Sequence, residues 1–138
     1  MIDAGFSMRQ TKERMRMHNV YMKNISDVLL THLDRDHFNP AWCRTLLHMG
    51  IAVHLHERHL HRAIRAGLDR SILRPFKSSI KFDTVQIETL HMAHDELGTV
   101  GFVFTYLDCG NRFGFATDLG RVPKSLLDTF VKLDVLAI

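Results

Sequence analysis

The stretch that decides the fold joins a short apolar run to a polar segment, and it reads Val28-Leu29-Leu30-Thr31-His32-Leu33-Asp34-Arg35-Asp36-His37. The apolar run predicts a short buried strand, so the polar side chains follow at its carboxyl end. Two imidazoles and two carboxylates are costly to bury this close together unless a cation compensates them. The pattern therefore favours a metal site, with an ordinary polar turn after a strand as the alternative.

The composition is that of one globular domain. The chain has 138 residues, of which 46% are hydrophobic and 24% are charged, and these values are ordinary for soluble proteins. Its apolar runs are short and its first residues lack a secretory pattern, so we expect a cytoplasmic protein outside the membrane. Cys43 and Cys109 form no CxxC pair, which argues against a zinc knuckle or a disulfide framework.

Basic residues are concentrated between positions 58 and 81. The net charge is only +3, but in this block Asp69 is the only acid, against Arg58, Arg62, Arg65, Arg70, Arg74, Lys77 and Lys81. A basic surface beside a metal site would suit nucleic acid or another phosphate-bearing substrate, because cationic side chains attract polyanions. A solvated helix face explains the same charges without any ligand. Both interpretations stay open.

The rest of the chain predicts helices alternating with strands, followed by hairpins. Ser7-Met8-Arg9-Gln10 is a capping-box pattern, which predicts a helix over residues 8–18. Asn39-Pro40 predicts the start of a second helix that runs to Gly50. We further expect helices at 57–66 and 123–131, and strands at 25–31, 51–54, 80–82, 85–90, 100–107, 112–117 and 133–138. This order favours an α/β layered fold in a single domain over residues 1–138.

Two further candidate ligands, His94 and Asp118, each follow a predicted strand. Strand ends of an α/β sheet are the usual place for ligand sites, because loops converge there. His91 is an alternative ligand from the same segment as His94. The histidine-rich run 54–61 does not fit the metalloprotease pattern HExxH, because His56 and His59 are spaced at i and i+3 instead of i and i+4. We expect surface or helix-start positions for that run.

These segments resemble the metallo-β-lactamase fold hydrolases, and most of all their bacterial branch of small exonuclease-like proteins. The resemblance rests, in chain order, on Ile2-Asp3-Ala4-Gly5, Leu29 to His37, His94-Asp95 and Ala116-Thr117-Asp118-Leu119-Gly120. It implies an αββα layered sandwich. Because the family's fold begins with strands ahead of the first segment and supplies a late histidine, the resemblance also implies a domain incomplete at both ends. Bare sheet edges would then favour self-association, so we expect a homo-oligomer.

By position, the resemblance implies a site for one or two divalent ions with the metal ligands His32, Asp34, Asp36, His37, His94 and Asp118. His32 and His94 would bind the first ion, Asp36 and His37 the second, and Asp118 would bridge the two. The implied activity is that of a metal-dependent hydrolase that uses metal-activated hydroxide. Asp36 would be its catalytic residue, because it would position the attacking water as well as bind metal.

Asp34 departs from the family motif HxHxDH, which has a histidine at this position. An aspartate exchanges a neutral nitrogen for a charged oxygen, and carboxylate-rich sites accept manganese or iron more readily than all-histidine sites. We therefore expect zinc first and leave manganese and iron open. The basic block favours phosphodiester or nucleic-acid substrates. The alternative is a non-catalytic truncated relative that binds metal, nucleic acid or a protein partner.

Overall fold

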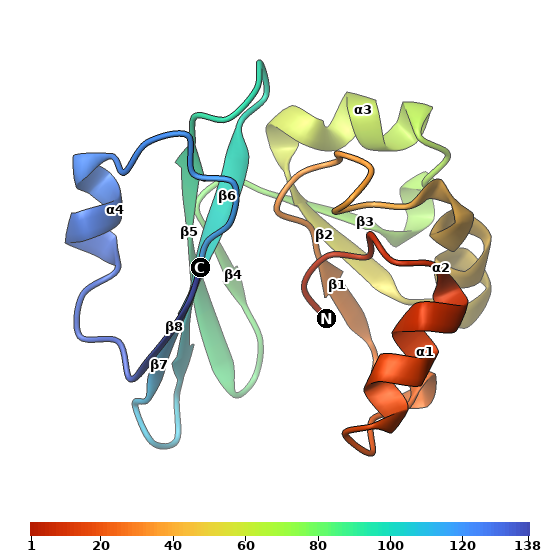
Figure 1. The fold of residues 1–138 in the computed structure, drawn as a ribbon, viewed down its shortest axis with the longest axis horizontal. Coiled ribbons are helices and arrows are strands. Elements are labelled where there is room, and N and C mark those ends of the chain that lie inside the picture. Colours follow the sequence, from red (N-terminus) through yellow and green to blue (C-terminus); the bar gives the residue numbers. More distant parts are fainter. The chain divides into compact units, whose positions relative to one another are not determined.

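The structure, a computed structural model, describes residues 1–138. The chain divides into two compact units, Met1–Pro75 and Phe76–Ile138. Each unit is built around one sheet, with the strand order β1-β2-β3 in the first and β4-β5-β6-β7-β8 in the second (Figure 1). The predicted mixed α/β class is confirmed. None of the helices has both the length and the apolar composition that crossing a bilayer requires.

The sheet of the first unit places two strand ends at one edge. β1 (Asp27–Leu29) and β2 (Ala52–His56) are parallel, with Leu29 opposite His54. The segments that leave this edge are therefore neighbours. The connecting elements are the helices α1 (Met8–Arg16), α2 (Cys43–Met49) and α3 (Leu60–Arg65), and the 3₁₀ turns Met22–Asn24, Pro40–Trp42, Glu57–His59 and Arg70–Ile72.

The first five residues lie beside β1 and extend its edge. Ile2 forms a parallel bridge with Leu29. The backbone N–H of Asp3 donates to the carbonyl of Leu29 at 2.9 Å, and that of Ala4 donates to the carbonyl of His37 at 2.7 Å. The segment is thus bonded both to the strand that precedes the ligand-bearing loop and to the loop itself.

Local sequence signals determine where the first helices begin and end. The Ser7 side chain accepts from the Gln10 backbone while the Gln10 side chain accepts from the Ser7 backbone, so the predicted capping box is present. Asn39 caps the turn that leads into α2, and Gly50 ends α2 with a φ of +65°. The core beneath these elements is apolar and includes Val28, Leu30, Trp42, Leu46, Val53 and Leu55.

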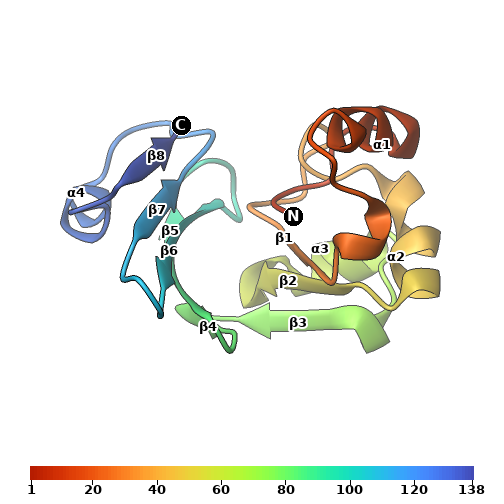
Figure 2. The same cartoon turned by 90° about the horizontal axis from the view of Figure 1, so that it is seen from below.

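The second unit is a mainly antiparallel sheet of β4 (Ser79–Lys81), β5 (Val85–Met92), β6 (Thr99–Tyr106), β7 (Arg112–Phe115) and β8 (Val135–Ala137). The strands are hydrogen-bonded in the order β4-β5-β6-β7-β8, and Figure 2 gives a second view of this sheet. Because β5 and β7 are both antiparallel to β6, they run in the same direction and end at the same edge. Helix α4 (Lys124–Thr129) packs on the sheet, where Leu126 lies in a cluster with Met92 and Ala116.

The sequence prediction missed one strand and merged two helical segments. β3 (Leu73–Phe76) contains Pro75, which removes a ladder donor, and proline is tolerated only in edge strands such as β3. The predicted helix at 57–66 is a 3₁₀ turn over Glu57–His59 followed by α3. The other predicted strands and helices are present, with ends that differ by a few residues.

Candidate metal centre

Asp3 is the acceptor around which the ligand-bearing loop of the first unit is organised. Its Oδ1 accepts from the Thr31 backbone N–H at 2.9 Å, and its Oδ2 accepts from the Thr31 hydroxyl at 2.8 Å. The same Oδ2 lies 2.8 Å from Nδ1 of His37. An ionised carboxylate can only accept hydrogen bonds, so both the hydroxyl and the imidazole nitrogen must donate to it.

These bonds determine which nitrogen of each imidazole carries the proton. Thr31 Oγ1 lies 3.0 Å from Nδ1 of His32. Since the hydroxyl has only one proton and gives it to Asp3, Oγ1 accepts from Nδ1–H of His32. His32 and His37 are therefore both protonated at Nδ1 when neutral, and both present a lone pair at Nε2. Histidines that bind metals are held in this way, with the remote nitrogen donating to a carboxylate or hydroxyl.

Each Nε2 atom faces a carboxylate oxygen from the same loop. Nε2 of His32 lies 3.6 Å from Oδ2 of Asp34, and Nε2 of His37 lies 3.6 Å from Oδ2 of Asp36. With metal–ligand bonds of about 2.0–2.2 Å, tetrahedral coordination places two donor atoms roughly 3.3–3.6 Å apart. Each pair therefore fits a shared divalent ion. The ring centroids of His32 and His37 are 4.1 Å apart, so the two pairs are adjacent.

Gly5 allows the first segment to pass close to the loop. A Cβ atom at this position would lie 1.6 Å from the carbonyl oxygen of Asp36, which is far inside van der Waals contact. Any other residue would push the loop away from Asp3. This close approach is the physical reason for glycine in the Ile2-Asp3-Ala4-Gly5 segment.

Asp34 is also bound on its other side. Nη2 of Arg62, on α3, donates to Oδ1 of Asp34 at 2.6 Å. Arg62 counted among the basic residues that could contact phosphate, but in the structure it is paired within the candidate centre. Nothing in the local sequence around Asp34 or Arg62 indicates this pair.

In the second unit, His94 and Asp118 extend from the same sheet edge. His94 follows β5 on an exposed loop, and Asp118 follows β7 with a φ of +54° and accepts from the Thr117 hydroxyl at 2.9 Å. A Cβ atom at Gly120 would lie 3.7 Å from the carbonyl oxygen of Ala93, so the two loops are adjacent. The structure therefore brings these two segments together within their own unit.

His91 has a structural role in the same loop. Its Nε2 lies 2.6 Å from the carbonyl oxygen of Leu97, which can only accept, so this nitrogen carries a proton. The Asp95 carboxylate accepts from the backbone N–H groups of Leu97 and Gly98 at 2.9 and 2.7 Å and closes the turn. Nε2 of His91 is therefore engaged within its own loop, and His94 stays the predicted ligand of the two.

In the histidine-rich run 54–61, His56 and His59 stand at helix starts as predicted, whereas a surface position is wrong for both because they are buried. His59 is 1% exposed, while His56 caps the following turn by accepting from the backbone of Arg58 at 3.3 Å. Nε2 of His54 lies 2.7 Å from Oδ1 of Asp27. Burial acts to raise the pKa of Asp27, but hydrogen bonds from Ser26 and His54 outweigh it, so the pKa lies below its usual value of 3.8.

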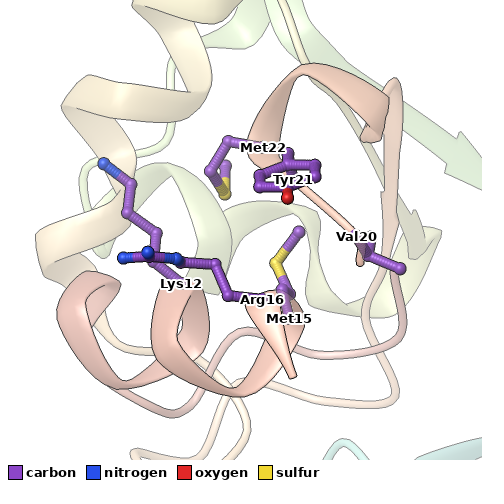
Figure 3. A pocket seen from close by; sticks show the side chains of 6 residues that line it. All are labelled: Lys12, Met15, Arg16, Val20, Tyr21 and Met22. Atoms are coloured by element: carbon purple, nitrogen blue, oxygen red, sulfur yellow. The ribbon is translucent and has the colours of Figure 1, made fainter. Parts of the chain in front are cut away.

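A separate hollow of about 180 Å³ lies beside α1, as Figure 3 shows, and is lined by Lys12, Met15, Arg16, Val20, Tyr21 and Met22. Its floor is apolar and its charged groups are cations. The lining offers no histidine, cysteine or carboxylate, so the hollow is unsuited to a metal ion.

Solved structures of the metallo-β-lactamase fold are similar to this chain. YhfI from Bacillus subtilis matches with a TM-score of 0.71 and 13% identity over 98% of this chain and 57% of its own. Zn²⁺-bound PqqB from Methylobacterium extorquens matches with a TM-score of 0.69 and 19% identity over 98% of this chain and 54% of its own. The short form of human tRNase Z matches with a TM-score of 0.67 and 15% identity over 98% of this chain and 64% of its own. At these identities the matches define the fold, which confirms the predicted class.

Residues 1–138 match the model of the family described as "Beta-lactamase superfamily domain", so the chain belongs to this family. The inferred resemblance to the metallo-β-lactamase fold family is thereby confirmed. The chain spans about half the length of the first similar structures, between 47% and 57% of each. A search of curated proteins gave no match.

Proposed function

We propose that the chain is the metal-binding part of a metal-dependent hydrolase. The ligands would be His32, Asp34, Asp36 and His37 from the first unit and His94 and Asp118 from the second. The observation that carries the proposal is the pairing of each Nε2 with a carboxylate oxygen at 3.6 Å, while Asp3 and Thr31 hold the opposite nitrogens. We expect one or two divalent ions, with zinc favoured by the imidazoles and manganese or iron allowed by the carboxylates.

A bound divalent ion supplies Lewis acidity and lowers the pKa of its water toward about 7. The protein's own residues supply position and proton control. His32, only 1% exposed, fixes the inner side of the centre, whereas the Asp36 side chain is 78% exposed and can reach a water molecule from solvent. Asp36 is the residue we propose to orient the attacking water by accepting its hydrogen bond.

Phosphodiester substrates are the class that the charges favour. Arg58, Arg65 and Arg70 of the first unit are exposed, and exposed guanidinium groups bind phosphate oxygens well. Arg62 and Arg74 are engaged within the protein, since Arg74 donates to the carbonyls of Ser71 and Leu73 at 2.9 Å. The basic block therefore contributes fewer cations to a substrate than the sequence alone suggests.

The decisive experiment measures metal content and phosphodiester hydrolysis in the purified chain. His32→Ala and His94→Ala should each reduce the bound metal per chain, and a chelator should abolish hydrolysis of a generic phosphodiester. His48→Ala, an exposed histidine on α2, is the matched control and should leave both values unchanged. If both ligand variants retain the full metal content, the proposed ligands are wrong.

A second candidate function, a binding module without catalysis, is favoured by the hollow beside α1. Lys12 and Arg16 line an apolar floor that includes Tyr21, and such combinations bind single-stranded nucleic acid through phosphate contacts and stacking. In this case nucleic acid would bind with strong salt dependence but without chelator-sensitive cleavage. Lys12→Gln combined with Arg16→Gln would then weaken binding, whereas His32→Ala would not.

A further inference from the structure

Asp34, the residue that replaces the family's second histidine, contacts a different residue with each of its two carboxylate oxygens. Its Oδ2 lies 3.6 Å from Nε2 of His32, on the side where an ion would bind. Its Oδ1 accepts from Nη2 of Arg62 at 2.6 Å, a short charge-assisted hydrogen bond. The side chains of Asp34 and Arg62 are 35% and 33% exposed, so water screens the attraction between their charges only in part.

Arg62 is held in register by the burial of its neighbours on α3 and the preceding turn. His59 is 1% exposed and Ala63 is fully buried, and these residues lie four apart on one helical face. The turn that leads into α3 begins directly after β2, whose end lies beside the end of β1. The guanidinium is therefore delivered to Asp34 by the fold and is not merely a long side chain that finds a nearby carboxylate.

We propose that Arg62 is the charge partner of Asp34, and that the two side chains together take the place of a neutral histidine in the metal centre. An ionised aspartate adds one negative charge that the histidine would lack, and the permanently charged guanidinium removes it. Oδ2 then serves as a ligand oxygen without changing the net charge of the site. This inference rests on the proposed metal-binding function and assigns Arg62 a positioning and specificity-determining role within it.

The proposal predicts an order of metal affinities that follows net charge. In Arg62→Gln the site gains one uncompensated negative charge, which attracts a divalent cation, so divalent ions should bind more tightly, by about tenfold. In Asp34→His the guanidinium is left beside a neutral ligand. Restoring the histidine motif alone should therefore weaken binding.

The double variant Asp34→His/Arg62→Gln returns the net charge to that of the unsubstituted chain. Its affinity should be close to the starting value, with preference shifted from manganese toward zinc because a nitrogen replaces an oxygen. Arg62→Lys keeps the charge and should bind metal like the unsubstituted chain. Arg44→Gln, at an exposed arginine on α2, is the control for simple loss of a positive charge.

The experiment is a calorimetric titration of the metal-free full-length chain and these variants with Zn²⁺ and with Mn²⁺. Tighter binding in Arg62→Gln, with Arg62→Lys and Arg44→Gln unchanged, supports the proposal. It is overturned if Asp34→His binds more tightly than the unsubstituted chain, or if Arg62→Gln binds equally or more weakly. If Asp34→His does not fold, the comparison of the metal affinities of Arg62→Gln and Arg62→Lys still tests the proposal. Absence of metal binding in the unsubstituted chain would instead refute the proposed function.

Discussion

At the scale of residues, one carboxylate controls the protonation of two imidazoles. Asp3 accepts a hydrogen bond from the Thr31 hydroxyl, so the hydroxyl oxygen is left to accept one from Nδ1–H of His32. The same carboxylate also accepts from Nδ1–H of His37. Both Nε2 atoms thus carry a lone pair instead of a proton because of one acceptor, the Asp3 carboxylate. Tautomers of unconstrained imidazoles interchange readily, so this arrangement would organise the two donor nitrogens in advance for the proposed ion.

Replacing Asp3 with asparagine should damage both histidines. An amide has one acceptor oxygen and places donor hydrogens where Oδ2 now accepts, so Thr31 and His37 cannot both keep their bonds. We expect a loss of metal affinity of about 10- to 100-fold and a loss of roughly 1–3 kcal/mol in the free energy of unfolding. Metal titration and thermal unfolding measure the two effects. Asp128→Asn, an exposed site on α4, is the control, and equal metal affinity in Asp3→Asn would contradict the role of this carboxylate.

The sequence reveals only the part of the centre that is local. His32, Asp34, Asp36 and His37 are close along the chain, so their clustering is readable from spacing. Asp3 and His37 are 34 residues apart, and Asp34 and Arg62 are 28 apart. No local pattern joins such partners. The resemblance to a family drew attention to the segment around Asp3, but the pairing with Arg62 follows only from the fold.

At the scale of elements, the ends of helices were predictable because their signals are short. The capping box at Ser7 and the glycine at position 50 act within a turn of the helix that they bound. β3 was missed because its residues pair with a distant strand and include Pro75, so burial and partners outweigh the local preference. Between the two parallel strands β1 and β2, Asp27 and His54 form a polar contact that no periodicity predicts.

This contact should contribute to the pH dependence of stability. The pKa of Asp27 is lowered in the folded protein, so its charged form stabilises the fold above the usual pKa of 3.8, and this contribution is lost as the pH falls through the lower folded pKa. Asp27→Asn should lower the midpoint of thermal unfolding near neutral pH by about 3 °C, for roughly 1 kcal/mol. The substitution should also make the free energy of unfolding fall less steeply as the pH decreases from about 5 to about 2. Unfolding curves across this range provide the measurement, and parallel curves for both proteins would refute the assignment.

At the scale of the whole molecule, the outer strand of the second sheet exposes apolar side chains. β8 pairs with β7 on one side and is the last strand in the sheet order. Val135 and Leu136 are 58% and 50% exposed, and Ile138 is 82% exposed. An apolar edge strand is a template for pairing with another chain. We therefore propose this strand as the surface through which the self-association predicted from the sequence would occur.

The 138-residue chain should therefore form dimers or larger species as its concentration rises. Val135→Lys places a charge on the exposed edge strand and should shift the population toward monomer, because a lysine at an edge opposes strand pairing. Light scattering coupled to size-exclusion chromatography gives the mass at each concentration. Lys132→Arg, which keeps the charge near the same strand, should leave the mass unchanged. A monomer at every concentration would remove the basis for this interface.

The position of Asp3 has an energetic consequence for the first five residues. They are bonded to Leu29 and His37, and their carboxylate supports the two imidazoles. Occupancy of the imidazoles and closure of this segment are therefore linked equilibria, and a ligand that binds only the closed form raises the free energy of local opening. The amide protons of Asp3 and Ala4 would then exchange with solvent more slowly as the centre fills. Residues 1–5 would therefore be held more firmly against the loop when a ligand occupies the two imidazoles.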